Sequence, residues 1–397
     1  MGKYILLISA VYPPEPVVSA KLSADLYQAL KADGMAVRVL HPVPTRPEGF
    51  RFDRFSTPDE NEVTLQSYTC PQSSIYGRFK ESFSFGKACA VYIKSHHQEI
   101  AVVYANAWPL VAQYRIVKAT KQFGIPVAMH IQDVYPESLT NKLSPLIGLV
   151  LQKLLLPMDR YILLHSDKVI AISEKMKDYL IESRRIDKKN VSVVLNWQNE
   201  QEFISYEQKH HNKAQHEKFT FMYLGNMGPV AGVDLLIDAF SLAGIENTRL
   251  VIAGSGSMKE GLKKKAKNNV AIEFWDVPSG EVPEIQSQAD VLLLPIRKGS
   301  AYSSIPSKLP AYMFSAKPIV GAMDEDCDTA DTIREARCGV IVKPDNIEAL
   351  ASVMKEMRNI DITSLEEMGR NGQQYALAHY SKGANLENLK RIICVFN

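Results

Sequence analysis

The sequence lacks an excess of either charge, a cysteine framework and an apolar run long enough to cross a bilayer. The formal net charge is only +2, so no overall field favours nucleic acid as a partner. Its five cysteines are odd in number, scattered and without a C-x-x-C pair, which disfavours a disulfide-stapled fold or a zinc site and fits a reducing cytoplasm. The longest later apolar stretch, Leu146 to Leu156, is interrupted by Gln152-Lys153 and is too short for a membrane span.

A signal peptide is not expected either. The first ten residues hold one lysine and a short apolar run, and Pro13-Pro14 follows. They lack the longer apolar region and the cleavage site of a signal peptide, whereas the run has the length of a buried strand. We therefore expect a cytoplasmic protein. Its 397 residues, 46% hydrophobic and 23% charged, are enough for two domains with substantial cores.

Strand-like apolar runs alternate with helical patterns along most of the chain. In the first half we expect strands at 4–9, 35–40, 101–104, 125–129, 168–172 and 191–195, with helices at 20–31, 110–122 and 174–182. In the second half we expect strands at 219–224, 249–253, 270–274, 290–295, 317–321 and 339–342, with helices at 233–242, 258–267 and within 347–394. Such alternation predicts two doubly wound α/β domains with parallel sheets.

The polar stretch 202–218 is predicted to link these domains. It contains His210-His211 and several Lys, Glu and Gln residues, which favour a solvated linker over a metal site at the histidine pair. The predicted boundaries are 1–201 for the first domain, 202–218 for the linker, 219–378 for the second domain and 379–397 for a C-terminal helix packing back on the first. Ligands of such folds bind in the cleft at the carboxyl ends of the strands.

A segment between two predicted strands of the second domain, Ser303 to Pro318, is typical of a phosphate site. Pro306 can start a short helix whose first turn carries Ser304, Ser307 and Lys308. A helix N-terminus offers unpaired N–H groups and positive partial charge to an anion. A helix capped by its own serine explains this stretch equally well.

Two glycine-rich loops follow strands of the same domain, at 225–232 and 254–257. Glycine there lets backbone N–H groups approach a phosphate. Neither loop has the spacing of a dinucleotide-binding fingerprint or a P-loop. Two such loops together with the Ser303–Pro318 segment favour a nucleoside diphosphate ligand.

Polar residues in the first domain follow the strand that ends near Met129. His130 is placed to hydrogen-bond a substrate hydroxyl, and Asp133 or Glu137 to orient that substrate, because side chains at this edge of a parallel sheet face the ligand cleft. Helix capping by Asp133 is an alternative of nearly equal weight.

These residues resemble those of a known family, the family 4 retaining glycosyltransferases with the two-Rossmann-domain GT-B fold. The nearest resemblance is to bacterial enzymes of O-antigen and capsule assembly, such as the N-acetyl-L-fucosamine transferases. The matching pieces run nearly end to end: Tyr12–Glu15, His130–Ser138, Ala171–Ser173, Asn196-Trp197, Tyr223–Gly228, Ala253–Gly256, Ala289–Val291 and Ser304–Pro310. They are specific for the superfamily and say less about the sugar.

The resemblance implies that the second domain binds a nucleotide sugar and the first binds the acceptor. It implies catalytic roles for His130, Asp133 and Lys308, with the transferred sugar near His130. The implied donor-binding residues are Gly225, Asn226, Gly254, Trp275, Arg297, Ser303, Ser304, Ser307 and Leu309. The implied acceptor-side residues are Pro14, Val17 and Ser19. No metal or other cofactor is implied, and a donor phosphate oxygen would accept the acceptor's proton.

Three departures from the family pattern affect the donor site. The two glutamates that many members carry in the Ser303–Pro318 segment correspond to Ser303 and Ala311. The usual arginine and lysine after the first strand of the second domain correspond to Asn226 and Ala231. Lys308 and Arg297 would have to supply the missing positive charge. The paired glycines of the first loop correspond to Val17-Val18.

The sequence is thus interpreted as a glycosyltransferase that moves a sugar, N-acetylated in our interpretation, from a UDP-sugar to a polyprenyl-diphosphate-linked saccharide during O-antigen or capsule synthesis. A nucleotide-sugar epimerase of the same fold and a non-catalytic sugar-nucleotide-binding subunit remain alternatives. Two segments that interleave aromatics with cations, 46–55 and 76–87, suggest docking at the inner face of the membrane. For 143–156 an ordinary core helix is slightly favoured over an apolar docking face.

Overall fold

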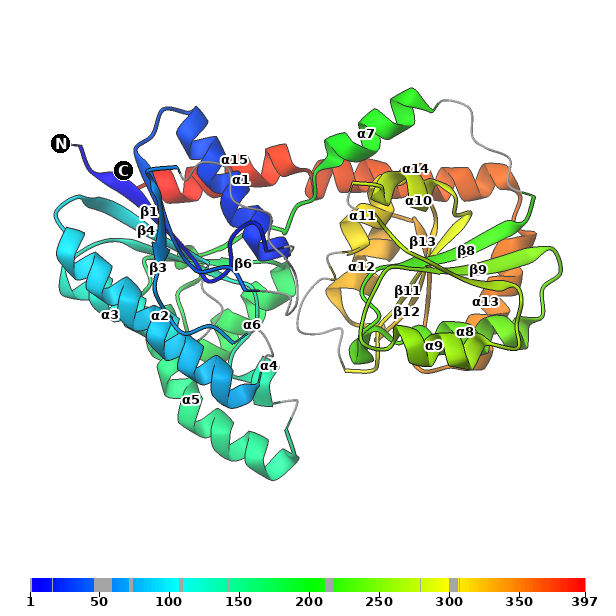
Figure 1. Cartoon of the computed structure of the whole chain (residues 1–397), viewed down its shortest axis with the longest axis horizontal. Coiled ribbons are helices and arrows are strands. Elements are labelled where there is room, and N and C mark those ends of the chain that lie inside the picture. The colour runs from blue at the N-terminus through cyan, green and yellow to red at the C-terminus, as the bar shows by residue number, and fades with distance from the viewer. Residues whose placement is uncertain are drawn as a thin grey trace. The chain divides into compact units, whose positions relative to one another are not determined.

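The computed structural model describes residues 2–15, 17–45, 59–70, 74–106, 110–140, 143–210, 217–278, 280–299, 306 and 308–396. The chain divides into two compact units (Figure 1). Unit 1 consists of Met1–Asn196 together with Asn385–Asn397, and unit 2 is Trp197–Ala384. Each unit has its own hydrophobic core.

Unit 1 is built on a parallel sheet of seven strands in the order β3-β2-β1-β4-β5-β6-β7. The strands are β1 (Tyr4–Ser9), β2 (Val37–Pro42), β3 (Glu62–Leu65), β4 (Ile100–Asn106), β5 (Val127–Ile131), β6 (Lys168–Ala171) and β7 (Val191–Val193). Strands β1 and β5 are buried at every residue, because helices cover both faces of the sheet. This is why the two strands are almost entirely apolar, with Ser9 at the end of β1 and His130 in β5 as the exceptions.

Helices pack on both faces of the unit 1 sheet, as right-handed crossovers between parallel strands require. One face carries α1 (Val18–Ala32) and α15 (Lys382–Cys394), and the other carries α2 (Ile75–His96), α3 (Leu110–Gln122), α5 (Pro145–His165) and α6 (Glu174–Arg184) (Figure 1). Two short helices, α4 (Glu137–Thr140) and the 3-10 turn η1 (Lys188–Asn190), lie in the connections. The ion pair between Lys390 and Asp33, at 2.6 Å, holds α15 to this unit.

Unit 2 has a parallel sheet of six strands in the order β10-β9-β8-β11-β12-β13. They are β8 (Phe219–Leu224), β9 (Thr248–Ala253), β10 (Ile272–Trp275), β11 (Val291–Pro295), β12 (Ile319–Ala322) and β13 (Gly339–Val342). The 3-10 turn η2 (Pro229–Ala231) precedes α8 (Val233–Ala243), which shares one face with α9 (Lys259–Ala266) and α13 (Ile347–Asn359). The other face carries α7 (Glu200–Lys209), α10 (Val282–Ser287), α11 (Lys308–Phe314), α12 (Asp328–Glu335) and α14 (Ile362–His379) (Figure 1).

The prediction of two doubly wound parallel sheets is confirmed. Four expected elements agree with the structure end to end, namely β1, α3, β8 and β13. The segment 76–87 is part of the long helix α2, and 143–156 belongs to α5. The segment 46–55 lies outside the described residues.

The segment expected to be the linker is structured differently. Its first part belongs to α7, whose Tyr206 hydroxyl is 3.0 Å from Ser287 Oγ within unit 2. The chain passes from unit 1 to unit 2 after Asn196 and returns after Ala384, not at 201 and 378. His210 Nδ1 lies 3.0 Å from the Tyr206 carbonyl, and His211 lies outside the described residues. The polar composition of residues 202–209 therefore reflects a partly solvent-facing helix.

Candidate functional site

Two glycine-containing turns of unit 2 lie against each other at the carboxyl ends of β8 and β9. The amide of Gly225 donates to the carbonyl of Ala253, at 3.0 Å, and the amide of Met227 donates to the carbonyl of Ser255, at 2.7 Å. Gly254 has φ +121°, and a Cβ on it would overlap the backbone of Gly225. The close approach of the two loops therefore requires glycine at position 254.

Lys308 begins α11, and its side chain runs across the face of Gly225. A Cβ added at Gly225 would overlap Lys308 Cε, so the missing side chain at position 225 leaves room for the lysine. Lys308 Nζ lies 4.9 Å from the centre of the Tyr223 ring, where the ring face attracts a cation.

The charge of Lys308 is uncompensated among the described residues, since its ammonium group has neither a hydrogen-bond nor an ion-pair partner there. Burial lowers the pKa of this amine to about 8, because desolvation disfavours the charged form. A bound anion would replace the interactions with water that the charged amine has lost. The two loops and the lysine together thus form an electropositive feature suited to phosphate.

Other predicted donor residues have structural partners. Arg297 forms ion pairs with Asp234 and, at 2.6 Å, with Asp345, so its charge is already compensated and the structure does not support it as a replacement for the missing phosphate-binding cations. Trp275 Nε1 donates to Glu273 Oε2 at 2.9 Å. The Trp275 carbonyl accepts from the amide of Gly254, at 3.0 Å, so this residue supports the second glycine loop.

The remaining donor candidates divide into described and undescribed residues. Asn226 is exposed, and its carbonyl accepts from the Tyr223 hydroxyl at 2.6 Å. Leu309 is fully buried, and its amide donates to the Pro306 carbonyl at 3.0 Å, so that amide already has a partner. Ser303, Ser304 and Ser307 lie outside the described residues.

In unit 1, His130 is a buried, neutral histidine with one unpaired nitrogen. It is the penultimate residue of β5 and only 1% exposed. Its Nδ1 lies 2.7 Å from the Tyr104 hydroxyl, whereas Nε2 is buried without a hydrogen-bond partner among the described residues. Burial lowers the pKa of His130 to about 3, so the ring is uncharged at neutral pH and can exchange a hydrogen bond with a hydroxyl group.

Further unpaired polar atoms lie at the same edge of the sheet. Asn106 ends β4, and the β4–β5 register pairs Ala105 with Met129, which makes Asn106 and His130 neighbours. Asn106 Nδ2 donates to Ser23 Oγ at 3.1 Å, but its Oδ1 is buried without a described partner. Because buried polar groups are almost always hydrogen-bonded, this edge is suited to a polar ligand such as a sugar.

Gln132 and Asn196 extend this polar edge beyond the ends of β5 and β7. Asn196 Nδ2 donates to Gln132 Oε1 at 2.9 Å. The second amide atom of each residue, Gln132 Nε2 and Asn196 Oδ1, is buried without a described partner. Asn106 and Gln132 do not stand out in the sequence as functional residues, since an amide after an apolar strand is also typical of an ordinary turn.

Two of the predicted acceptor-side residues lie between β1 and α1, and the third, Ser19, lies in the first turn of α1. Val17 is 37% exposed and directly precedes α1, and Pro14 is partly buried. The carbonyl of Ser19 accepts from Asn106 Nδ2 at 3.4 Å. The structure thus connects Ser19, through Asn106, to the edge that carries His130.

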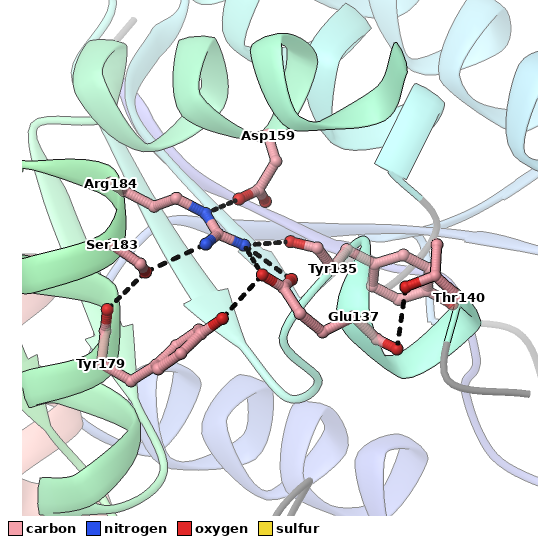
Figure 2. A network of polar contacts seen from close by, with 7 residues as sticks. All are labelled: Tyr135, Glu137, Thr140, Asp159, Tyr179, Ser183 and Arg184. Carbon is pink, nitrogen blue, oxygen red and sulfur yellow. Dashed lines mark hydrogen bonds and ion pairs between the residues drawn. The ribbon is translucent and has the colours of Figure 1, made fainter. Parts of the chain in front are cut away.

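Asp133 and Glu137 differ in their surroundings. Asp133 is partly buried in the loop after β5, and α4 starts only at Glu137, so Asp133 is not the residue that caps this helix. Glu137 is bound by Arg184 Nη2 through both carboxylate oxygens, at 2.9 and 2.7 Å, and accepts from the Tyr179 hydroxyl at 2.8 Å (Figure 2). Burial alone would raise the pKa of Glu137, but these hydrogen bonds lower it below its usual value.

Arg184 joins three helices to the loop that follows His130 (Figure 2). Its Nε donates to Asp159 Oδ2 of α5 at 2.6 Å, and Nη2 also donates to the Tyr135 carbonyl at 2.7 Å. The Arg184 side chain is only 2% exposed. With its carboxylate committed to this buried network, Glu137 is a structural residue, and the prediction that it orients a substrate is not supported.

No group of three or more His, Cys, Asp or Glu residues within the described ranges could hold a metal ion. The chain does carry closely spaced carboxylates after β12, beginning with Asp324. The Asp324 Oδ2 atom accepts from the amide of Gly299, at 2.7 Å. None of the helices in the described parts of the chain has the length and apolarity that a bilayer crossing needs.

Comparison with known proteins identifies the class of protein that carries these two sites. A model described as "Glycosyl transferase 4-like domain" matches residues 20–197, and one described as "Glycosyl transferases group 1" matches residues 218–359. Together with the two parallel-sheet units, these matches define a glycosyltransferase. More particularly, the chain belongs to the GT-B glycosyltransferases of the family 4-like type.

Three similar proteins illustrate this relationship. The probable glycosyltransferase WbjE of Pseudomonas aeruginosa is 23% identical over 264 residues, which are 65% of this chain and 66% of WbjE. The putative colanic acid biosynthesis glycosyl transferase WcaI of Escherichia coli strain K12 is 22% identical over 387 residues, covering 89% of this chain and 91% of WcaI. The crystal structure of Anabaena HepE in complex with UDP-glucose has the same fold, with a TM-score of 0.67, 15% identity and 99% of each chain covered.

Proposed function

We propose that this protein is a retaining glycosyltransferase that transfers a sugar from a UDP-sugar to a lipid-linked saccharide in the assembly of a bacterial surface polysaccharide. The observation that carries the donor half of this proposal is the charge of Lys308 beside Gly225 and Gly254, which no described residue compensates. A diphosphate would supply the missing counter-charge. The named role of WcaI in colanic acid biosynthesis and the UDP-glucose bound to HepE support this choice of pathway and donor.

The proposed chemistry needs a stabilised leaving group more than a protein base. As the glycosidic bond to the nucleotide breaks, negative charge grows on the departing diphosphate, and Lys308 would stabilise that charge in a partly desolvated position. Neutral His130 would hold a hydroxyl of the transferred sugar through Nε2. In the retaining course that we propose, the acceptor hydroxyl gives its proton to a donor phosphate oxygen. Activity is expected to persist in EDTA, because no step of this scheme uses a metal ion.

The finer assignments remain proposals that rest on the family resemblance. They include the N-acetylated sugar, the polyprenyl-diphosphate carrier, a place in O-antigen or capsule synthesis and a position on the inner face of the membrane. The amide atoms of Asn106 and Gln132 that have no partner among the described residues support a saccharide partner in unit 1, because an amide can both donate to and accept from hydroxyl groups.

The two alternatives are less well supported. An epimerase needs acid–base carboxylates, and Glu137 is committed to Arg184 while burial keeps His130 from accepting a proton near neutral pH. A non-catalytic binding subunit is motivated by Ser303 and Ala311 in place of glutamates. It predicts nucleotide-sugar binding without turnover.

The decisive experiment measures binding and hydrolysis of UDP-, GDP- and dTDP-sugars by wild type and Lys308→Ala, with Lys264→Ala as control. Lys264 is an exposed lysine of α9 without a described partner. We expect preferential binding and slow hydrolysis of a UDP-sugar, with affinity reduced about tenfold or more in Lys308→Ala only, since a charge-assisted contact is worth roughly 1.5–3 kcal/mol. Binding that is equal in all three proteins would refute the proposed donor site. Epimerisation without acceptor would favour the second enzyme class, and binding without any turnover would favour the third.

A further inference from the structure

One face of unit 1 carries many cationic side chains, although the chain as a whole has only a small net charge. Helices α2, α3 and α5 lie next to one another on this face (Figure 1). Their cationic residues are Arg78, Lys80, Lys87, Lys94, Arg115, Lys118, Lys121, Lys153 and Arg160. Nine cations on three helices contrast with a net charge of only +2 for all 397 residues.

The two acidic residues of these helices offset only one of the nine cations, because both are buried and only one of them pairs with a member of this set. Glu81 is 6% exposed and paired with Arg78 at 2.9 Å. Asp159 is 4% exposed and paired with Arg184 at 2.6 Å. Lys121 is also paired, with Asp167 at 3.1 Å, so the seven other cations give the solvent-facing part of the three helices its excess of positive charge. The next helix, α6, ends this region with three acidic residues, Glu174, Asp178 and Glu182.

The same face exposes large apolar side chains. On α5 they are Leu146 (80% exposed), Ile147 (60%), Leu149 (52%), Val150 (61%) and Leu154 (69%). On α2 they are Tyr76 (78% exposed), Phe79 (56%), Phe83 (43%) and Val91 (57%). The expectation of a core helix at 143–156 is therefore wrong for its first three turns, where Gly148 is the one buried residue between Pro145 and Leu156.

The apolar ends of the two helices lie toward one edge of the sheet. Helix α2 follows β3 and α5 follows β5 with α4 between them. In a parallel α/β unit, helices that follow strands start near the carboxyl ends of those strands. The exposed side chains from Tyr76 to Phe83 and from Leu146 to Leu154 occupy the first turns of α2 and α5. They therefore lie on the side where His130 and Asn106 end their strands.

We propose that the exposed face of α2, α3 and α5 binds an anionic phospholipid bilayer, with the first three turns of α5 entering the headgroup region. Apolar side chains rimmed by lysine and arginine match the layered chemistry of such a surface, in which anionic phosphates lie above acyl chains. A second copy of this chain fits less well, because a two-fold interface would place the same cations against each other. The inference deepens the proposed function by naming the surface that would bring the enzyme to a lipid-linked acceptor.

The buried network of Figure 2 connects this surface to the candidate site. Asp159 lies on α5, and Arg184 binds both Asp159 and the carbonyl of Tyr135, five residues after His130. The helix proposed to meet the bilayer is thus fixed to the loop that follows His130. This connection keeps the orientation of that loop relative to α5 constant when the protein is bound.

Vesicle co-sedimentation tests the proposal with the full chain. The first test variant combines Leu146→Ser with Val150→Ser, and the second combines Lys87→Glu with Lys153→Glu. Their matched controls in unit 2 are Val270→Ser, at a valine that is 98% exposed, and Lys264→Glu. We expect wild type to bind phosphatidylglycerol vesicles at low salt and phosphatidylcholine vesicles only weakly. Each test variant should lose at least about tenfold in affinity, with the controls unchanged.

Several outcomes would overturn this assignment. Wild type that fails to bind phosphatidylglycerol vesicles, or test variants that bind as well as the controls, would refute it. If the apolar variant instead dissociated an oligomer seen by light scattering, a second copy would be the occupant. Thermal melting distinguishes lost binding from lost folding, since all substituted side chains are exposed. Transfer to a water-soluble acceptor should be the same in all variants, so that absent transfer with intact vesicle binding would refute the proposed function alone.

Discussion

The lowered pKa of Lys308 makes a quantitative prediction about the pH dependence of donor binding. Burial holds this pKa at about 8, and a diphosphate binds the charged form of the amine. The charged fraction is then about 91% at pH 7 and about 9% at pH 9. Donor affinity should therefore fall roughly tenfold between these two pH values.

The measurement is the dissociation constant of an intact UDP-sugar from pH 6.5 to 9.5, followed by calorimetry at constant ionic strength. The matched control is Lys308→Arg, because a guanidinium stays charged throughout this range. Its profile should be flat over the interval in which wild type loses affinity. Ionisation of the uracil ring at the alkaline end affects both proteins alike, so the difference between their profiles reports on position 308.

Stability should change in the opposite direction over the same range. The folded pKa of Lys308 lies below its unfolded value, so the unfolded chain binds more protons between pH 8 and the ordinary lysine pKa of about 10.4. The contribution of this residue to the free energy of unfolding therefore rises with pH while donor affinity falls. If wild type and Lys308→Arg lost affinity in parallel, or if wild type lost none, the argument that Lys308 contacts the diphosphate would be refuted.

Two further substitutions test the geometry of the sites. Gly225→Ala should displace the Lys308 side chain and weaken donor binding about tenfold or more, since its Cβ would overlap Lys308 Cε at a residue with φ +155°. The control is Gly261→Ala, in open space on α9. Equal donor affinities in the two variants would contradict the close approach of Lys308 to Gly225. Arg184→Met should lower the free energy of unfolding, measured in urea, by about 3–5 kcal/mol, because Glu137 and Asp159 would be left buried without their partner. Adding Glu137→Gln and Asp159→Asn should recover part of this loss. A loss below about 1 kcal/mol would mean that the network does not support the fold.

The parts of the fold that could be predicted are those in which local pattern and tertiary environment agree. Strands β1 and β8 are apolar except for Ser9 and Thr220, because they lie in the middle of their sheets. Helix α3 has its apolar residues on one side. Helix α2 was missed because its exposed face alternates aromatics with lysines, a pattern typical of a surface loop as well. The exposure of Leu146 could not be foreseen, since periodicity does not distinguish an uncovered apolar helix from a core helix.

The candidate site was predictable only where a residue is marked by its own motif. Gly225, Gly254 and Lys308 lie in recognisable loops of one domain, and the structure brings them together. Asn106 has no motif, and its position beside His130 follows from the pairing of β4 with β5. Arg184 resembles a surface cation at the end of a helix. Its burial depends on two carboxylates that are distant in the sequence, and local reasoning cannot pair them.

Unit 1 consists of two separate segments of the chain, and this has a consequence for how the protein is synthesised. Its last helical segment begins at Asn385, after the 188 residues of unit 2 from 197 to 384. At a synthesis rate of roughly 5–20 residues per second, residues 1–196 wait about 10 to 40 s on the ribosome before this segment emerges. Until then the surface of unit 1 that receives Lys390 and Asn388 is uncovered. Unit 2 can thus finish folding first, although unit 1 is translated first, and chaperones have their longest access to the earlier half of the chain.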